Sequence, residues 1–291
     1  MTKDEAVKFI TAHYPNENVQ WVDKGMMNHV AIVGGKFVYK FPKTPDNFKL
    51  LQKESAVYEI LKGVTTIAIP QVIELNLEKQ YLCLNYVAGH IISPQQASKL
   101  TLLQQTNLAN KLTLFIKEIN SAEVRQKFDE VAETETSELF YIERWLKKAA
   151  EYCQANPNEY SVKYLELYDK LYQDLPYGFC GGEFLAHKDL HEDNMMFDDD
   201  MNLVGIIDFA EMRYVSIYSE LRTVARFGAD VVEQILQNIC DAGQGVTTRQ
   251  VLLFAQVYEM CILIDDKFVK KDLPWRIELA NYYLKKWDLV I

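Results

Sequence analysis

A short polar segment, residues 187–194, holds the densest group of side chains able to do chemistry in this sequence. It runs His-Lys-Asp-Leu-His-Glu-Asp-Asn between two apolar stretches. So many hydrogen-bonding groups in one loop are unfavourable unless they bind a ligand or one another. Asp208 follows fourteen residues after Asn194, at the end of the apolar run 203–207. We therefore expect this loop and Asp208 to belong to one functional site.

Asn194 and Asp208 are expected to lie side by side. The apolar runs 195–197 and 203–207 are separated by three aspartates, which favour a turn and so predict a hairpin. Amide and carboxylate oxygens are ligands that Mg²⁺ uses together with phosphate oxygens. Asp189, five residues before Asn194, would orient or accept a hydroxyl proton. The pattern predicts phosphoryl transfer, with Asp189 catalytic and with Asn194 and Asp208 as metal ligands.

A phosphoryl-transfer site of this kind also needs a lysine on a strand and a glutamate on the next helix. Lys40 lies in the predicted strand 36–41, on the face opposite Phe37, Tyr39 and Phe41. In the helix that follows, Glu54 lies on the apolar stripe. A glutamate that faces inward needs a cation, and Lys40 is the expected partner.

The elements that must position these residues divide the chain into two regions. Residues 1–88 are mostly strand, with one helix that begins after Thr44 and ends near Leu61. Residues 89–291 show helical spacing over 94–120, 137–154 and 159–173 and again from 217 onward, interrupted by the hairpin. We predict an α+β fold with a small antiparallel-sheet N-terminal lobe and a larger helical lobe, with the boundary at 88–89.

Composition and charge exclude several classes. The chain has 291 residues and a net charge of −10, which disfavours nucleic acid as a partner. No apolar stretch is long enough to span a membrane, the polar first residues lack the core of a secretory signal, and the five cysteines form no C-x-x-C pair. We expect a cytoplasmic globular protein that binds neither nucleic acid nor membrane.

The loop and the later Ile-Ile-Asp-Phe segment, residues 206–209, resemble the aminoglycoside phosphotransferase family, whose members include kinases of aminoglycoside and macrolide antibiotics. The resemblance implies a protein-kinase-like fold and a Mg²⁺-dependent transfer from ATP or GTP to a hydroxyl. It also implies nucleotide-binding roles for Val38 at the adenine and for the backbone of Asn85 and Val87. The segment 24–29 would cover the phosphates, with Gly25 and Asn28 among its residues.

The acceptor is expected to be a small cationic molecule that bears hydroxyl groups, an aminoglycoside being the best single choice. Residues 90–291 carry a net charge of −11, and carboxylates that line a cleft concentrate cations. Glu211, Glu259 and Asp265 are the main candidates to bind it. Relatives often carry Gly-Asp-Pro-x-x-Asp after Asp208. Here Ser216 replaces the first acid, and Glu220 can serve as the last, in a structural role.

Two other interpretations stay open. A kinase of the same fold can act on another acceptor, such as a macrolide, choline, a sugar or an amino acid, because the motifs hardly report on the acceptor. A metal-dependent hydrolase would use His187, Asp189, His191 and Asp193 as ligands, but it leaves Lys40 and Glu54 unexplained.

Overall fold

The computed structural model describes residues 1–22, 27–131, 138–174, 184–239, 246–270 and 274–287, without the side chains of 138–143, 269–270 and 275. Its contacts divide the chain into two compact units. Unit 1 comprises Met1–Ser93, Leu114–Glu133 and Glu192–Arg213, and unit 2 comprises Pro94–Thr113, Thr134–His191 and Tyr214–Ile291. The lobe boundary at 88–89 stays a prediction.

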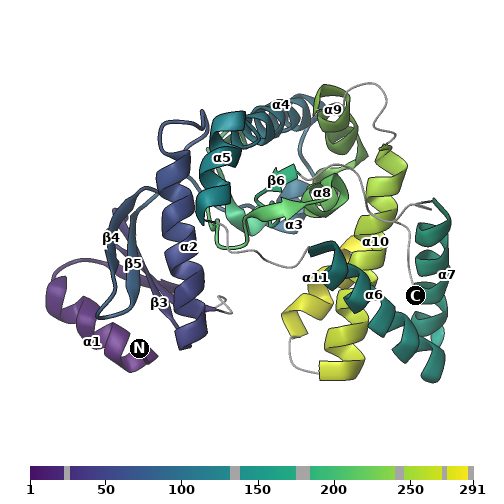
Figure 1. Cartoon of the computed structure of the whole chain (residues 1–291), viewed down its shortest axis with the longest axis horizontal. Coiled ribbons are helices and arrows are strands. Elements are labelled where there is room, and N and C mark those ends of the chain that lie inside the picture. Colours follow the sequence, from purple (N-terminus) through teal and green to yellow (C-terminus); the bar gives the residue numbers. More distant parts are fainter. Residues whose placement is uncertain (23–26, 132–137, 175–183, 240–245, 271–273, 288–291) are drawn as a thin grey trace. The chain divides into compact units, whose positions relative to one another are not determined.

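An antiparallel sheet of five strands forms the centre of unit 1, in the order β1-β2-β3-β5-β4. Strands β3, β4 and β5 of this sheet are labelled in Figure 1. The strands are β1 (Val19–Val22), β2 (Asn28–Val33), β3 (Phe37–Pro42), β4 (Val72–Asn76) and β5 (Tyr81–Asn85). Gly34 and Gly35 both have positive φ, as a two-residue hairpin turn between β2 and β3 requires. Across β3, Lys40 lies opposite Val30 on β2 and Leu82 on β5.

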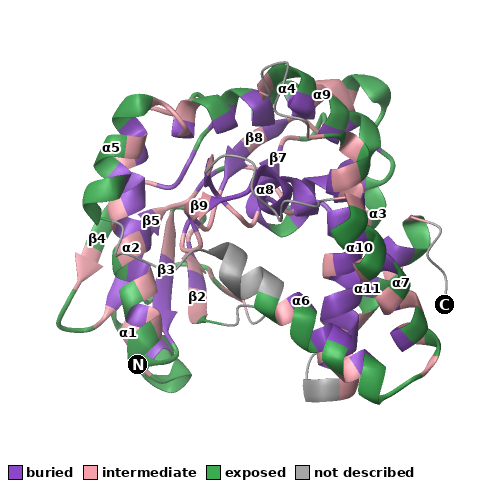
Figure 2. Ribbon diagram, turned by 45° about the vertical axis from the view of Figure 1, so that its right-hand side comes forward, coloured by how far each residue is buried: buried purple, intermediate pink, exposed green. Residues whose placement is uncertain are grey.

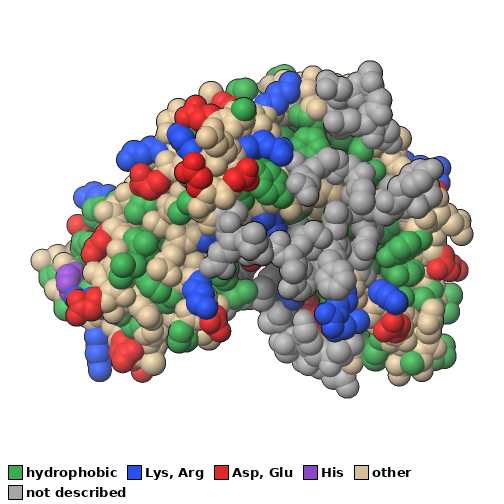
Figure 3. Space-filling model, in the orientation of Figure 1, with side chains coloured by type: hydrophobic (Ala, Val, Ile, Leu, Met, Phe, Trp, Pro, Cys, Tyr) green, Lys and Arg blue, Asp and Glu red, His purple; other side chains and the backbone are tan. Residues whose placement is uncertain are grey.

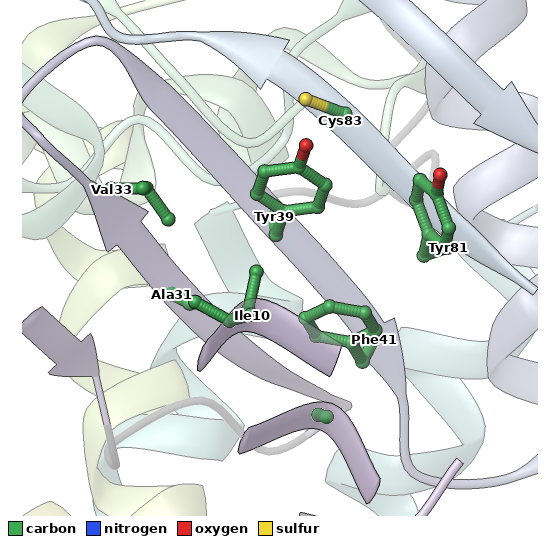
Figure 4. Close-up of a cluster of buried hydrophobic side chains, with 8 residues drawn as sticks. Ile10, Ala31, Val33, Tyr39, Phe41, Tyr81 and Cys83 are labelled. Carbon is green, nitrogen blue, oxygen red and sulfur yellow. The ribbon is translucent and has the colours of Figure 1, made fainter. Parts of the chain in front are cut away.

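One face of this sheet carries an apolar cluster under the helix α1 (Lys3–His13). Figure 4 shows aromatic side chains of β3 and β5 beside Ile10 of that helix. The cluster consists of Ala6, Ile10, Ala31, Val33, Tyr39, Phe41, Tyr81 and Cys83. Thr2 and Glu5 form a capping box that begins α1. We had expected a single helix in this region, so α1 is an addition to the prediction.

The helix α2 (Pro45–Leu61) packs against β3, β4 and β5. Its first turn agrees with the prediction, since the Thr44 hydroxyl accepts a hydrogen bond from the Asn47 N–H and Pro45 opens the helix. Glu54 is buried among the apolar residues of the stripe, which brings a carboxylate to the side of the sheet that carries Lys40.

The predicted hairpin forms from β7 (Met195–Phe197) and β8 (Leu203–Ile206), directly after a short 3-10 helix, η1 (Glu192–Asn194). Asp198 closes its turn by accepting hydrogen bonds from the N–H groups of Asp200 and Asn202. Gly205 on β8 lies against Val87, and a Cβ at position 205 would overlap with the Val87 side chain. The helix α5 (Ala122–Val131), which the sequence analysis did not anticipate, packs against α2.

Unit 2 is mainly helical, and the buried helix α10 (Thr248–Ile264) contacts α6, α7, α8, α9 and α11. The predicted helix 94–120 is divided into α3 (Pro94–Ala97) and α4 (Leu102–Ile119), and α4 ends in unit 1. All residues of α8 are buried (Figure 2). The other elements are α6 (Glu138–Ala155), α7 (Glu159–Asp174), β6 (Phe184–Ala186), β9 (Arg213–Val215), α8 (Ile217–Val224), the 3-10 helix η2 (Ala225–Phe227), α9 (Ala229–Ile239), the π-helix η3 (Asp265–Lys270) and α11 (Pro274–Lys286).

Within the described residues, no helix is both long and apolar enough to cross a membrane. On the face drawn in Figure 3, acidic and basic side chains are interspersed. The thiols of Cys83, Cys153 and Cys261 are buried, whereas Cys180 and Cys240 lie outside the described residues.

Candidate active site

Lys40 is held between two carboxylates within unit 1. Its Nζ lies 2.6 Å from Glu54 Oε1 and 2.8 Å from Asp208 Oδ1. The Lys40 and Glu54 side chains are buried, whereas about half of the Asp208 side chain is exposed, 48%. The structure therefore brings together three residues that the sequence analysis singled out, and it leaves one of the carboxylates open to a ligand.

Electrostatics keep Lys40 charged. Burial works to lower the pKa of Lys40, but the charges of Asp208 and Glu54 outweigh it, and the pKa lies above its ordinary value. Tyr58, one turn after Glu54 on α2, donates its hydroxyl to Glu54 Oε1 at 2.7 Å. Burial, followed by the charge of Glu54, raises the pKa of Tyr58, so Tyr58 stays a neutral donor. A fixed ammonium of this kind suits phosphate oxygens.

Asp208 is positioned by the residues on either side of it. The N–H of Ile207 donates to the carbonyl of Asn194 at 3.0 Å, so the open end of the hairpin brings these positions together as expected. Phe209 is fully buried and packs edge-on against Tyr58 and Phe115. Asp208 itself has φ 67°, a left-handed conformation that a non-glycine residue adopts only where its surroundings impose it.

The donor set at Asn194 and Asp208 fits a magnesium ion that shares its coordination with a nucleotide. Mg²⁺ is usually bound through one or two protein oxygens plus phosphates and water, without a complete protein cage. Asp208 presents a half-exposed carboxylate. Asn194 directly precedes β7 and accepts a hydrogen bond at its carbonyl from Ile207, the residue before Asp208. Among the described residues, no group of three or more His, Cys, Asp or Glu side chains is arranged to hold a metal. One carboxylate and one amide oxygen therefore fit a Mg²⁺ ion whose other ligands are phosphate oxygens and water.

The loop that carries Asp189 lies in unit 2 and is held by its own histidines. His191 Nε2 lies 3.2 Å from Asp189 Oδ2, and the N–H of Asp189 donates to His187 Nδ1 at 3.3 Å. Burial alone would raise the pKa of Asp189, but His191, then Arg222 and His187, lower it below the usual range. Asp189 is therefore a carboxylate at neutral pH, with 37% of its side chain exposed.

Two side chains of α8 form hydrogen bonds with the backbone of this loop. Glu220 is buried and accepts hydrogen bonds from the N–H groups of His187 at 3.1 Å and Lys188 at 2.6 Å. Arg222 donates to the carbonyl of Lys188 at 2.5 Å, and its Nη2 lies 3.9 Å from Asp189 Oδ1. The structural role of Glu220 agrees with the expectation, whereas the role of Arg222 was not predicted. The available signal was a second charged residue two positions after Glu220 in the same short segment.

The residues expected to bind the nucleotide lie along the sheet of unit 1. Val38 is on β3, opposite Leu84, and Asn85 ends β5. The Asn85 N–H donates to the Gln71 carbonyl at 3.0 Å. The Val87 side chain is buried against Gly205.

The segment expected to cover the phosphates is described only in part. Asn28 begins β2, and the buried Asn28 Oδ1 accepts no hydrogen bond from the described residues. The preceding residue, Met27, receives the Asn47 side chain at its carbonyl, at 2.7 Å. Gly25 lies outside the described residues.

The residues expected to bind an acceptor differ in their surroundings. Glu211 is partly exposed and pairs with Arg213 at 3.1 Å, and Asp265 is half-buried at the start of η3. Glu259 is buried, and its carboxylate accepts two hydrogen bonds from Arg226, at 3.0 and 2.6 Å. We correct the expectation for Glu259, since a buried, paired carboxylate serves the packing of α10. The Trp275 side chain, a further candidate, lies outside the described residues.

This fold and this site are those of the kinase-like phosphotransferases. Solved structures of that class are similar to this chain. The GDP complex of wild-type aminoglycoside 2'-phosphotransferase-IIIa shares 20% identity at a TM-score of 0.79, covering 98% of each chain. The streptomycin-ATP-APH(2")-IIa ternary complex shares 17% identity at a TM-score of 0.67, covering 100% of this chain and 99% of that chain. Macrolide 2'-phosphotransferase type I shares 14% identity at a TM-score of 0.67, covering 100% of this chain and 98% of that chain. At these identities the similarity concerns the fold, and it confirms the predicted kinase-like α+β class.

Membership of a protein family is shown by a separate comparison with family models. The model of the phosphotransferase enzyme family matches residues 21–254, most of the chain. The protein belongs to this family and is an O-phosphotransferase, as the motifs around Asp189 and Asp208 predicted.

Proposed function

We propose that this protein transfers the γ-phosphate of ATP or GTP to a hydroxyl group of a small cationic molecule, with an aminoglycoside as the favoured acceptor. The observation that carries the proposal is the Lys40 ammonium, fixed at 2.6 Å from Glu54 and 2.8 Å from Asp208. A buried cation held in this way is unfavourable to build unless its charge is used. Phosphate oxygens of a nucleotide are the anions it suits.

Each residue then has a chemical role. Lys40 binds phosphate oxygens and orients them, and Glu54 keeps Lys40 in place. Asp189 accepts a hydrogen bond from the acceptor hydroxyl, and it takes up the proton once that oxygen has bonded to the γ-phosphorus. The bond to the bridging oxygen breaks, and the nucleoside diphosphate leaves. Asn194 and Asp208 would hold Mg²⁺, which supplies positive charge to the phosphates when bound.

The low pKa of Asp189 fits this role. A carboxylate that is ionised before the acceptor arrives can receive a hydrogen bond from its hydroxyl at once. Proton transfer then follows phosphorus–oxygen bond formation, which is favourable because the hydroxyl becomes more acidic as it bonds to phosphorus. The role of Asp189 is therefore chiefly to orient the acceptor oxygen.

The nucleotide base is proposed to lie against Val38 and to bond the backbone of Asn85 and Val87, with Gly25 and Asn28 near the phosphates. Nothing in these backbone contacts separates adenine from guanine by itself. Structures with similar folds were solved with GDP and with ATP, which supports testing both nucleotides. The cytoplasmic location is likewise kept as a prediction.

A cationic acceptor is supported by charge. Residues 90–291 carry a net charge of −11, and Glu211 and Asp265 keep partly exposed carboxylates. Similar structures include complexes with kanamycin and with gentamicin, which supports an aminoglycoside. Another similar structure is a macrolide phosphotransferase, which supports a macrolide as the alternative. A macrolide carries less positive charge than an aminoglycoside, so we rank it second.

The test is turnover of ATP and GTP with Mg²⁺ against kanamycin, gentamicin, a macrolide, choline and simple sugars, followed by detection of the phosphorylated product. We expect an aminoglycoside to stimulate diphosphate release and to gain one phosphate by mass. Asp189→Asn should remove most of that turnover while nucleotide binding persists. Stimulation by another acceptor alone would keep the kinase and replace the acceptor class. Absence of nucleotide binding would overturn the proposal as a whole.

The acceptor residues need a separate comparison. Glu211→Gln should raise the KM for the acceptor and leave the KM for the nucleotide unchanged, because the substitution removes one partly exposed negative charge. Glu259→Gln is the matched control, since the same charge is removed at a buried position. An acceptor KM that rises equally in both variants would remove Glu211 from the proposed acceptor site.

A further inference from the structure

Both backbone groups of Lys188 are held by side chains of α8. Its N–H donates to Glu220 Oε2 at 2.6 Å, and its carbonyl accepts a hydrogen bond from Arg222 Nη1 at 2.5 Å. Lys188 has φ 71°, a left-handed conformation that is unfavourable for a residue with a Cβ. The Lys188 carbonyl belongs to the peptide group that joins Lys188 to Asp189. The orientation of that peptide group therefore decides where the Asp189 side chain begins.

Arg222 is built into the interior of unit 2. Only 5% of its side chain is exposed, and its guanidinium lies 4.7 Å from the centre of the Tyr258 ring on α10. The same guanidinium also donates to the Ser219 carbonyl. A planar guanidinium can serve several acceptors at fixed angles, whereas a lysine ammonium at the same place is a point charge.

The guanidinium also reaches Asp189 itself. Arg222 Nη2 lies 3.9 Å from Asp189 Oδ1, on the carboxylate oxygen opposite to the one that faces His191. Each oxygen of Asp189 therefore lies near a nitrogen of a different residue, at 3.2 Å for His191 and 3.9 Å for Arg222. Two such neighbours restrict rotation of the carboxylate, which a single one would allow.

We propose that Arg222 is a positioning residue for phosphoryl transfer: it holds the left-handed Lys188 peptide and thereby fixes the direction of the Asp189 carboxylate. The inference rests on the proposed function, because it assigns Arg222 a task only if Asp189 orients the acceptor. Arg222 also helps to lower the pKa of Asp189, after the larger effect of His191, which agrees with this arrangement.

Arg226 offers a matched control. It lies one helical turn after Arg222, it is buried, and its guanidinium is 4.7 Å from the ring centre of Tyr283. Its fork of donors binds Glu259 on α10. Replacing either arginine with lysine removes the same fork from the same kind of surroundings, but only Arg222 contacts the Asp189 loop through the bonds described above.

The experiment compares Arg222→Lys with Arg226→Lys in kcat, in the KM of nucleotide and acceptor, and in Tm. For Arg222→Lys we expect kcat to fall about 10- to 100-fold with little change in the nucleotide KM, as for a slightly misplaced reacting group. Arg226→Lys should lower Tm by a similar amount and keep kcat within about twofold. In an Asp189→Asn background, Arg222→Lys should add little further loss, because the group it positions is already disabled.

Several results would overturn the inference. They are an unchanged kcat in Arg222→Lys, an equal loss of kcat in both lysine variants, or a full additional loss in the Asp189→Asn background. Arg222→Gln is a second variant that keeps one amide donor, and it should show the same fall in kcat. If neither Arg222 variant folds while Arg226→Lys does, Arg222 serves stability and the inference is wrong.

Failure of the proposed function has a different signature. In that case the wild-type protein shows no turnover that Asp189→Asn removes, and the role of Arg222 is rejected together with that of Asp189. Turnover that depends on Asp189 but not on Arg222 rejects the present inference alone.

Discussion

The hydroxyl of Tyr58 donates to Glu54 Oε1, the same oxygen that accepts from Lys40. Lys40 and Tyr58 thus share one acceptor, and Glu54 is fixed from both the sheet and its own helix. The Tyr58 ring also packs against Phe209, directly after Asp208. One tyrosine therefore links the lysine, the glutamate and the segment that presents Asp208.

Tyr58→Phe tests this link with the loss of a single oxygen. The ring and its packing against Phe209 remain, while Glu54 loses one of its two donors. We expect the free energy of unfolding to fall by about 1 kcal/mol, as for loss of one hydrogen bond. The KM for the nucleotide should rise as Lys40 becomes less firmly held. Urea unfolding and initial-rate kinetics measure the two effects, and a variant unchanged in both would show that Tyr58 is only a packing residue.

Lys40→Met is expected to abolish most turnover and also to destabilise the protein. Removing the cation leaves Glu54 buried without its partner, which typically costs about 3–5 kcal/mol when one member of a buried pair is lost. Binding of the nucleotide should weaken because its phosphates lose the ammonium. Lys49→Met, on the exposed side of α2, is the control for loss of a lysine. Retained nucleotide affinity in Lys40→Met would contradict the assigned role.

The lowered pKa of Asp189 predicts how turnover depends on pH. The folded-state pKa lies below the ordinary value of about 4, so Asp189 stays ionised and should not limit kcat between about pH 5 and neutrality. Its contribution to stability is complete above the unfolded pKa and is lost as the pH falls through the lower folded value.

His191→Gln should change this profile, because His191 makes the largest contribution to lowering the pKa of Asp189. We expect the acid limb of the kcat profile to move to higher pH in the variant. A kcat profile with saturating substrates, extended down to about pH 3 so that it includes the acid limb, checks this shift. A His191→Gln profile that overlays the wild type would show that His191 does not act on Asp189.

The contact of Gly205 with Val87 gives a prediction that concerns packing alone. Gly205→Ala places a Cβ where the Val87 side chain lies, and overpacking of this kind costs about 1–3 kcal/mol. Val87→Ala makes room, so the double variant should recover most of the loss from Gly205→Ala. Unfolding free energies of the two single variants and the double variant form the cycle. Additive losses would mean that the two residues do not meet.

The local parts of the site were predictable because short patterns determine them. Strand alternation set the face of Lys40, the apolar stripe set that of Glu54, and three aspartates marked the hairpin that brings Asn194 and Asp208 together. These patterns depend on neighbours within a few residues. The sequence therefore predicted which of these positions lie together, without the distances between them.

The missed features depend on contacts between distant segments. Nothing near Arg222 in the sequence indicates that its guanidinium meets the Lys188 carbonyl, 34 residues earlier. Glu259 was assigned to a substrate although it lies within the apolar helix 251–264, where a lone acid predicts a buried partner such as Arg226. The helix α1 was readable from its Thr2 and Glu5 capping box and was overlooked.

The buried cysteine thiols allow transient unfolding of the two units to be followed separately. Cys83 belongs to the apolar cluster of unit 1, while Cys153 and Cys261 lie in unit 2. Burial raises the pKa of Cys83 and of Cys153, which further slows their alkylation. With Cys180 and Cys240 replaced by serine, the labelling rate at each remaining cysteine would follow the transient exposure of its own unit. Mass spectrometry of the labelled cysteines would therefore measure how often each unit opens, independently of the other.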